Sequence, residues 1–400
     1  MGFMHNWFKS VLPGCWRMSF TKWNFLMTIF GVFTFLADIG LDLWITFKYF
    51  QEGVPAFGLL TIFFVIWASL IIQAFSYTWF QDDCDEHSCP KKILILHVFQ
   101  LGTFVRYWYV LKYGYKVNCK CNAKKTNWEE TKTRAVEAMT DLSMLRCFKT
   151  YLESTPQLIL QLYILMTHKT ITIFQYASIL VSVTSISWST IDYQMSLRKS
   201  LPGKKGIGVG APMLFFLFYK FFTLTSWILS IVLLLYCNIH IFTALLVMLF
   251  VAGVLWACKV QTEFCKTLGM EFLYRAVVGI ILIFTFFNVK GSRTLLPISI
   301  YYVVRTLTTA GILVLTTYLR PNFVKTVVFA ILSIAVVVAL GFGILSLILY
   351  YGCFHPSLQS GEGTIEDESG GDAVDGPSIY AVVGSPSRTR SPRIQKFIMP

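Results

Sequence analysis

The sequence predicts an all-α fold: a polytopic membrane helical bundle of about eight spanning helices plus two re-entrant helices in two pseudo-repeats, with a disordered C-terminal tail. Two observations predict this fold. The 400-residue chain is 55% hydrophobic with a mean hydropathy of +0.61, and only 14% of its residues are charged, about half the share usual in soluble domains. Several apolar runs also reach about 20 residues, the length that crosses the hydrocarbon core of a bilayer.

Ten hydrophobic segments follow one another along the chain. The first lies behind Lys9, Arg17 and Lys22 and lacks the small-residue cleavage site of a signal peptide, so we expect it to be retained as a span. In chain order the segments lie near 24–48, 56–80, 93–113, 151–168, 173–194, 213–237, 241–259, 271–289, 295–318 and 325–352.

The loops between the segments predict which side of the membrane each one faces. The N-terminus 1–23 and the stretches 114–150, 195–212 and 259–270 are basic, and the positive-inside rule places such loops in the cytosol. The net charge of +13 is spread over these loops and the tail. It therefore indicates contact with anionic lipid, and we expect no nucleic-acid partner.

Two segments cannot be simple spans if this orientation holds. Were every segment to cross, 93–113 would deliver a basic stretch to the outside, and this segment also contains His97, Gln100 and Arg106. A second re-entrant segment, 271–289, then leaves both termini in the cytosol. Re-entrant backbone is tolerated only where protein or water surrounds it, so the sequence predicts a polar interior.

The re-entrant segments divide the chain into similar halves. The first membrane repeat covers 24–194 and the second 213–352, and in each the third of five segments is re-entrant. This order suggests a duplicated architecture. The cytosolic N-terminus 1–23, the cytosolic loop 195–212 and a cytosolic regulatory tail, 353–400, complete the domain organisation.

A cytosolic amphipathic helix is predicted near 128–150, where apolar residues recur at steps of three and four. It could lie on the membrane surface or pack on the cytosolic face of the bundle. Its polar face is mixed in sign, which favours packing. The apolar positions are Val136, Met139, Leu142, Leu145, Phe148 and Leu152.

The tail contains a protease motif. Asp372, Asp375 and Gly376 form an Asp-x-x-Asp-Gly pattern, which executioner caspases cut after the second Asp. Residues 357–375 are acidic with no Lys or Arg, and we expect them to be disordered. Residues 376–400 carry Arg and Lys and no acid. Cleavage after Asp375 would therefore separate an acidic stump from a basic peptide.

Two carboxylates lie deep in the first span. Asp38 and Asp42 are four residues apart, so they share one helix face, roughly 6 Å apart along the axis. Each costs about 2.5–3.5 kcal/mol at mid-bilayer, and the pair needs a cation, a shared proton or water. They form either a hydrophilic lining or a buried ion pair, with Arg106, Lys220 or Arg305 as the partner.

The fourth segment opens on polar residues. Pro156 suits the first position of a helix and Ser154 or Thr155 suits its N-cap, which would place Glu153 near the positive end of the helix dipole. Gln157 continues the polar face inward. Ordinary capping and hydrogen bonds between helices explain these residues equally well.

The remaining charges divide into two predicted groups. Glu271 and Arg275 are four residues apart and are expected to pair, and Asp192 is expected to be an interfacial anchor at the end of its segment. The predicted lining residues are Asp38, Asp42, Glu153, Gln157 and Arg106. The predicted structural charge pairs involve Glu271, Arg275, Asp141, Asp192, Lys220 and Arg305.

Signals of an enzyme are weak. The glycine-rich stretch 203–210 lacks the spacing of a phosphate-binding loop, and the close cysteine groups, Cys84 with Cys89 and Cys119 with Cys121, lack the spacing and His partners of a zinc site. We therefore expect no enzyme activity, no metal and no cofactor. Without a nucleotide site, any transport should run downhill.

Six sequence blocks resemble the XK-related family. The resemblance as a whole covers about residues 20–356. The blocks are TDLSMLR at 140–146, ESTPQLILQLY at 153–163, ISWSTIDYQ at 186–194, RKSLPG at 198–203, MEFLYR at 270–275 and YYGCFHP at 350–356.

The resemblance implies a caspase-activated phospholipid scramblase of the plasma membrane, which exposes phosphatidylserine on apoptotic cells as an engulfment signal without ATP. It also implies a two-repeat bundle with re-entrant helices. The implied partners are phospholipids and an executioner caspase, and a relative in the family depends on a single-span chaperone subunit.

The mechanism that we expect joins the lining residues to the tail. The lining gives lipid headgroups a polar track, which avoids the desolvation cost of the hydrocarbon. The basic segment 376–400 docks on the cytosolic side and holds the track shut until a caspase cuts. The alternatives are an ion channel or small-solute transporter with a polar pore, a structural subunit of a receptor or protease, and a membrane-embedded enzyme.

Overall fold

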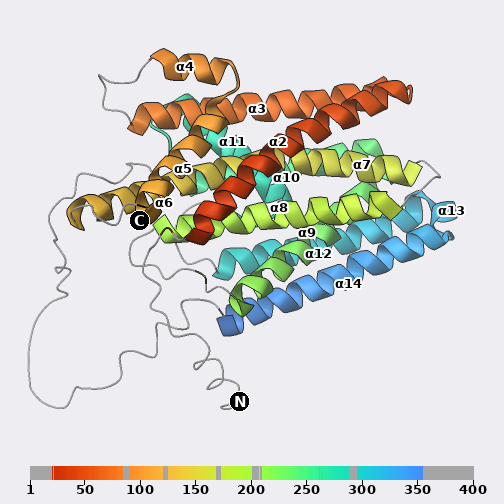
Figure 1. Cartoon of the computed structure of the whole chain (residues 1–400). Helices are drawn as coiled ribbons and strands as arrows, with labels where there is room; N and C mark the ends of the chain where they lie inside the picture. The colour runs from red at the N-terminus through yellow and green to blue at the C-terminus, as the bar shows by residue number, and fades with distance from the viewer. Residues whose placement is uncertain are drawn as a thin grey trace, which may run out of the picture.

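The computed structural model describes most of the membrane body. The described residues are 22–83, 91–119, 125–167, 173–200, 210–260, 264–287 and 295–354, together with Phe20, Ile207 and Thr262. Within these ranges the chain forms helices and short connections and no strand (Figure 1). The predicted all-α membrane fold is confirmed.

The first half of the chain forms a run of helices that follows the predicted hydrophobic segments. Its elements are α2 (Lys22–Gln51), α3 (Pro55–Asp83), α4 (Lys91–Val98), α5 (Gly102–Cys119), α6 (Lys125–Lys149), a π-helical turn, η1 (Thr150–Ser154), α7 (Thr155–Thr167) and α8 (Ile173–Ser200).

The second half forms a similar run. Its elements are α9 (Ala211–Cys237), α10 (Ile239–Lys259), α11 (Leu268–Phe284), α12 (Leu295–Leu319), α13 (Pro321–Val324), α14 (Val327–Leu349) and a second π turn, η2 (Tyr350–Phe354).

Six of the described helices are long and apolar enough to cross a membrane. They are α2, α3, α9, α10, and the stretches Leu296–Leu319 and Val327–Cys353. The other two predicted crossings fall on α7 and α8. With 13 residues α7 is short for a crossing, and α8, although it has 28 residues, is rich in Ser and Thr. Their passage through a bilayer stays a prediction.

The predicted re-entrant segment 93–113 is not one helix. It breaks at Gln100, whose φ of 63° turns the chain between α4 and α5. The side chain of Gln73 on α3 fixes the turn, because its Oε1 accepts the Gly102 N–H at 3.1 Å. With 8 residues α4 cannot cross a bilayer. Figure 1 shows α4 and α5 beside α3, and the re-entry of this pair into a membrane stays a prediction.

The predicted amphipathic helix packs in the bundle, as its mixed charge favoured. Helix α6 contacts α3, α5 and α8. Its apolar residues Leu142, Leu145 and Phe148 are buried, but so are Ser143 and Cys147 on its other sides. The C-terminal half of α6 is therefore buried all round rather than along one stripe.

One hydrophobic core joins the two halves. In it Trp79 and Phe148 of the first half pack with Trp227, Tyr274 and Phe284 of the second. The central helix is α9. In its most apolar 18-residue stretch 67% of the residues are buried, against 17% in the corresponding stretch of α2. Helix α2 thus lies at the periphery, packed on α3 and α5 (Figure 1).

Candidate functional site: an acidic cluster between α2 and the π turn

A π turn connects α6 to α7 and sets the position of Glu153. Pro156 has no N–H to donate, and its ring would clash with the carbonyl four residues earlier in a regular helix. The chain instead widens by one residue: Thr155 donates both its N–H and its hydroxyl to the carbonyl of Thr150, the latter at 2.9 Å. Such π turns are rare and often lie at functional sites.

The predicted helix start at this point is wrong. Ser154 lies inside the π turn and Thr155 has helical dihedral angles, φ −70° and ψ −48°, so neither is an N-cap. The helix runs on from α6 without a free N-terminus. Glu153 is therefore not stabilised by a helix dipole, and its environment must come from other elements.

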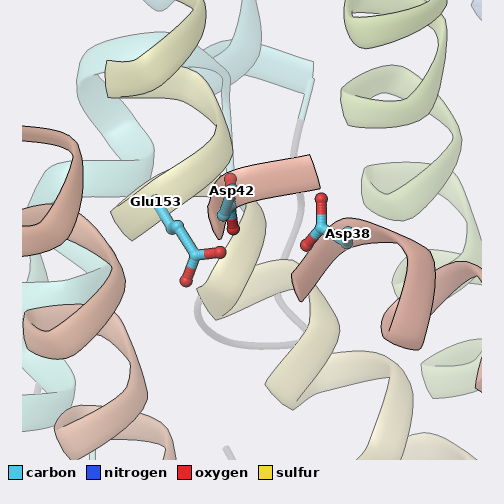
Figure 2. Close-up of side chains that lie close together, drawn as sticks. All are labelled: Asp38, Asp42 and Glu153. Atoms are coloured by element: carbon cyan, nitrogen blue, oxygen red, sulfur yellow. The ribbon is translucent and has the colours of Figure 1, made fainter. Parts of the chain in front are cut away.

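Three carboxylates converge at the π turn. Asp38 and Asp42 approach from α2 and Glu153 from η1, and one oxygen of each lies within 4.8 Å of the others (Figure 2). Glu153 is only 2% exposed and Asp42 7%, whereas the side chain of Asp38 is 44% exposed. The structure thus brings together three of the predicted lining residues.

The cation of this cluster is Lys149. Its Nζ lies 2.8 Å from Oε1 of Glu153 and also pairs with Asp38. Burial acts to lower the pKa of Lys149, but the carboxylates of Glu153 and Asp38 outweigh it and raise the pKa, so the ammonium stays charged. The predicted partners, Arg106, Lys220 and Arg305, are wrong for this pair of aspartates.

Sequence reasoning missed Lys149, although a signal was present. Lys149 stands four residues before Glu153, the spacing at which side chains of one helix meet. The two residues were assigned to separate elements, a cytosolic helix and a new span. A continuous helix through Pro156 would have shown the pair.

The cluster holds more negative than positive charge. Three carboxylates against one ammonium leave two surplus negative charges when all are ionised. Like charges this close cannot all stay ionised without water, a proton or another cation. Carboxylate oxygens are also the ligands of Ca²⁺ and Mg²⁺, but here the Lys149 ammonium already serves as a counter-ion.

Gln157 extends the cluster by one turn. It lies on α7 four residues after Glu153 and is 9% exposed. Its amide is close to the carboxylate of Asp42, yet its Nε2 has no hydrogen bond of ordinary length in the described part of the chain. A buried amide donor beside a surplus of carboxylates can hold water or the polar atoms of a ligand.

Comparison with known proteins shows the family of this chain. The model of the XK-related family matches residues 26–356, more than half of the chain. The chain belongs to the XK-related family.

Individual relatives agree with that assignment. The quoted blocks resemble XK-related protein 9, and one such protein, from Tetraodon nigroviridis, is 33% identical over 95% of this chain and 99% of its own. An XK-related protein 8 of Gasterosteus aculeatus is 32% identical over 85% of this chain and 86% of its own. The XK-related match includes both halves and the whole acidic cluster.

In this XK-related protein Arg106 is not part of the cluster, which corrects the predicted lining. Its guanidinium binds Asp141 at 3.0 Å and the Ser76 carbonyl at 2.8 Å, and also approaches Asp83 at 3.9 Å. It stacks on Phe80, 3.7 Å from the ring centroid. Arg106 therefore holds α5 against α3 and α6. Asp141, which was predicted to belong to a structural charge pair, is its partner.

Asp192 is paired rather than an interfacial anchor. Its carboxylate lies 3.4 Å from Nη1 of Arg146 on α6. The same guanidinium donates to the Tyr107 hydroxyl at 3.0 Å, and Tyr107 donates to the Gly31 carbonyl at 3.0 Å. This chain of contacts links α8, α6, α5 and α2.

The other predicted charge pairs divide. Glu271 and Arg275 pair at 3.3 Å, with Thr262 bridging them. Lys220 and Arg305 are buried but have no carboxylate partner among the described residues.

The caspase motif, Asp372, Asp375 and Gly376, lies outside the described residues.

Proposed function

We propose that this chain is a phospholipid scramblase, in which the acidic cluster gives headgroups a polar track while acyl chains stay in the bilayer. Lipid would move in both directions without ATP. In this proposal the protein is a multi-pass protein of the plasma membrane with both termini in the cytosol, acts on phospholipids without a cofactor, and is not an enzyme.

One observation carries the proposal: a cluster with surplus charge reaches the face of a lipid-exposed helix. Phe33 and Trp44 on α2 are 65% exposed, as residues that face acyl chains would be. On the same helix the side chain of Asp38 is 44% exposed. From Asp38 the carboxylates lead inward through Asp42 to Glu153.

The chemistry of the cluster suits a lipid headgroup. Charged groups in hydrocarbon lose their hydration at high cost, so a headgroup crosses only where polar groups replace water. The ammonium of a choline, ethanolamine or serine headgroup would meet the surplus carboxylates, and the Lys149 ammonium would meet its phosphate. Lys149 and the amide of Gln157 then keep the track from being purely anionic.

Regulation by the tail is part of the proposal and rests on the sequence. An executioner caspase would cut after Asp375 and release the basic segment 376–400, which otherwise holds the track shut. Scrambling would then expose phosphatidylserine on apoptotic cells, where it marks them for engulfment. A single-span chaperone subunit could accompany the chain on its way to the plasma membrane.

The experiment places the purified chain in liposomes that carry a fluorescent phospholipid, with dithionite outside to bleach accessible label. We expect bleaching of inner-leaflet lipid only after caspase treatment, and no caspase effect in Asp375→Ala. In the cleaved protein, Asp38→Asn and Asp42→Asn should slow lipid movement at least tenfold, which corresponds to about 1.4 kcal/mol of barrier.

The matched control is Glu52→Gln. Glu52 lies at the end of the same helix, exposed and paired with Lys48, away from the cluster. It should leave the rate unchanged. Normal scrambling by folded Asp38→Asn and Asp42→Asn variants would refute the track, and a caspase response in Asp375→Ala would refute the switch.

A second candidate function is an ion channel or small-solute transporter. The surplus of carboxylates favours it, because acidic side chains also line cation paths. Cation flux from the same liposomes without lipid movement would support this function over scrambling.

A further inference from the structure

Two buried cations lie on neighbouring helices in the second half of the molecule. Lys220 on α9 is 1% exposed and Arg305 on α12 is 6% exposed. The two helices pack together, with the Tyr219 hydroxyl donating to that of Tyr302 at 2.6 Å. Lys220 and Arg305 lie near enough for their charges to repel each other.

Lys220 has only neutral partners among the described residues. Its Nζ donates to Oγ1 of Thr285 at 2.8 Å and to the Phe286 carbonyl at 3.2 Å. It also lies 4.9 Å from the ring centroid of Tyr219. These contacts offset part of the cost of burying an ammonium, but none of them neutralises its charge.

Arg305 is less well satisfied. Its guanidinium lies 4.5 Å from the ring centroid of Trp227 and donates through Nη1 to Tyr301. Its Nη2 has no hydrogen-bond partner in the described structure, and neither do the Trp227 Nε1 and the Thr309 Oγ1. Thr309 stands one turn after Arg305, on the same face of α12.

All three of these buried groups can donate a hydrogen bond, and what they lack is an acceptor. Buried donors in native proteins are nearly always paired, so an unpaired set beside a guanidinium indicates a missing ligand. An oxyanion would supply the acceptor and the negative charge together. Arginine binds phosphate oxygens through its planar fork, and lysine adds a point charge.

We propose that Arg305, Trp227 and Thr309, with Lys220 nearby, form a binding site for a phosphate group. The phosphate belongs either to a phospholipid headgroup or to a free anion. The lipid form rests on the proposed function, and it would give the second half a site for the phosphate to complement the acidic cluster in the first half. Val304 and Leu307, which flank Arg305 on α12, are exposed, so the opposite face of this helix is available to lipid.

The test measures binding to the full-length purified chain in detergent by its thermal unfolding midpoint. The probes are dioctanoyl phosphatidylserine, dioctanoylglycerol, which lacks the phosphate, and inorganic phosphate. A ligand that binds only the folded state raises the midpoint as its concentration rises. We expect the phospholipid to raise it and dioctanoylglycerol not to do so.

The variants assign that shift to the site. Arg305→Gln should weaken the apparent affinity for the phospholipid roughly tenfold or more, because it removes a charge-assisted hydrogen bond. Lys325→Gln is the matched control, since Lys325 is an exposed cation beyond the end of the same helix. If Arg305→Gln does not fold, Thr309→Val removes one donor at nearly constant shape and should also weaken binding.

The outcomes distinguish a phospholipid headgroup from a free anion, and the phosphate site from the proposed function. A shift with inorganic phosphate alone indicates a free anion, and a shift with the phospholipid alone indicates a headgroup. Equal shifts with and without the phosphate group, or unchanged binding in Arg305→Gln or Thr309→Val, would overturn the site. Because binding is measured without a membrane, intact binding with no scrambling would count against the proposed function and not against this site.

Discussion

Lys149 and Glu153 bridge the junction of α6 and the π turn, with Nζ and Oε1 2.8 Å apart. Because Lys149 also pairs with Asp38, this one ammonium ties α6 and η1 to α2. It is the only cation that an ion pair places in the cluster within the described part of the chain. The stability of the first half should therefore depend on it.

Lys149→Met should destabilise the protein by about 3–5 kcal/mol, because it leaves buried carboxylates without a counter-charge. Thermal unfolding in detergent measures the change. Adding Glu153→Gln to this variant should recover part of the loss, because it removes one of the stranded charges. Lys48→Met on α2, where the lysine is exposed, serves as the control. An unfolding midpoint unchanged in Lys149→Met would contradict the assigned role.

Gly31→Ala should destabilise the protein by about 1–3 kcal/mol, because the new methyl group would collide with the guanidinium of Arg146. Arg146 would have to leave Tyr107 and Asp192 to make room. Gly40→Ala lies on the same helix with open space around it, and it should be neutral or stabilise by up to about 1 kcal/mol. Equal unfolding midpoints in the two variants would show that Arg146 is not held against α2.

The positions of the helices and the shared face of Asp38 and Asp42 could be predicted from the sequence. Runs of apolar residues set helix lengths directly, and Asp38 and Asp42 could be placed on one face because helical spacing is fixed. The assignment of Arg106 failed for another reason. Which of several cations meets an acid depends on how helices pack, and spacing along one helix holds no information on its neighbours.

The junction between α6 and α7 illustrates the same limit. Pro156 after Ser154 and Thr155 is typical of a helix start, and local preference alone favours that reading. In the structure Phe148 and Tyr151 are buried on either side of Lys149, so packing keeps the helix continuous. The π turn then accommodates Pro156 without moving these buried side chains out of the core.

Arg106→Lys should destabilise the protein by about 2–4 kcal/mol even though the charge is kept. A lysine cannot bind Asp141 and the Ser76 carbonyl together while stacking on Phe80. The exposed pair of Arg134 with Glu130 offers the control, and Arg134→Lys should change stability by less than about 0.5 kcal/mol. Because Arg106 lies outside the acidic cluster, folded Arg106→Lys should scramble lipid at the normal rate once cleaved. Slower lipid scrambling by an Arg106→Lys variant of normal stability would show that Arg106 does belong to the polar track.

The last prediction concerns the force that holds the basic tail in place. If electrostatic attraction docks segment 376–400 on the cytosolic side, then changing Arg388, Arg390 and Arg393 to Gln should raise the activity of the uncut protein towards that of the cut one. High salt should do the same to the unaltered chain, because the Debye length falls to about 3 Å at 1 M.

The liposome assay measures both effects, and a variant with Ser385, Ser387 and Ser391 changed to Ala tests whether any change in the tail suffices. That control should stay inactive until it is cut. If the uncharged tail still blocks scrambling and caspase still relieves the block, then the apolar end at Phe397 and Ile398 holds the tail instead of its charge.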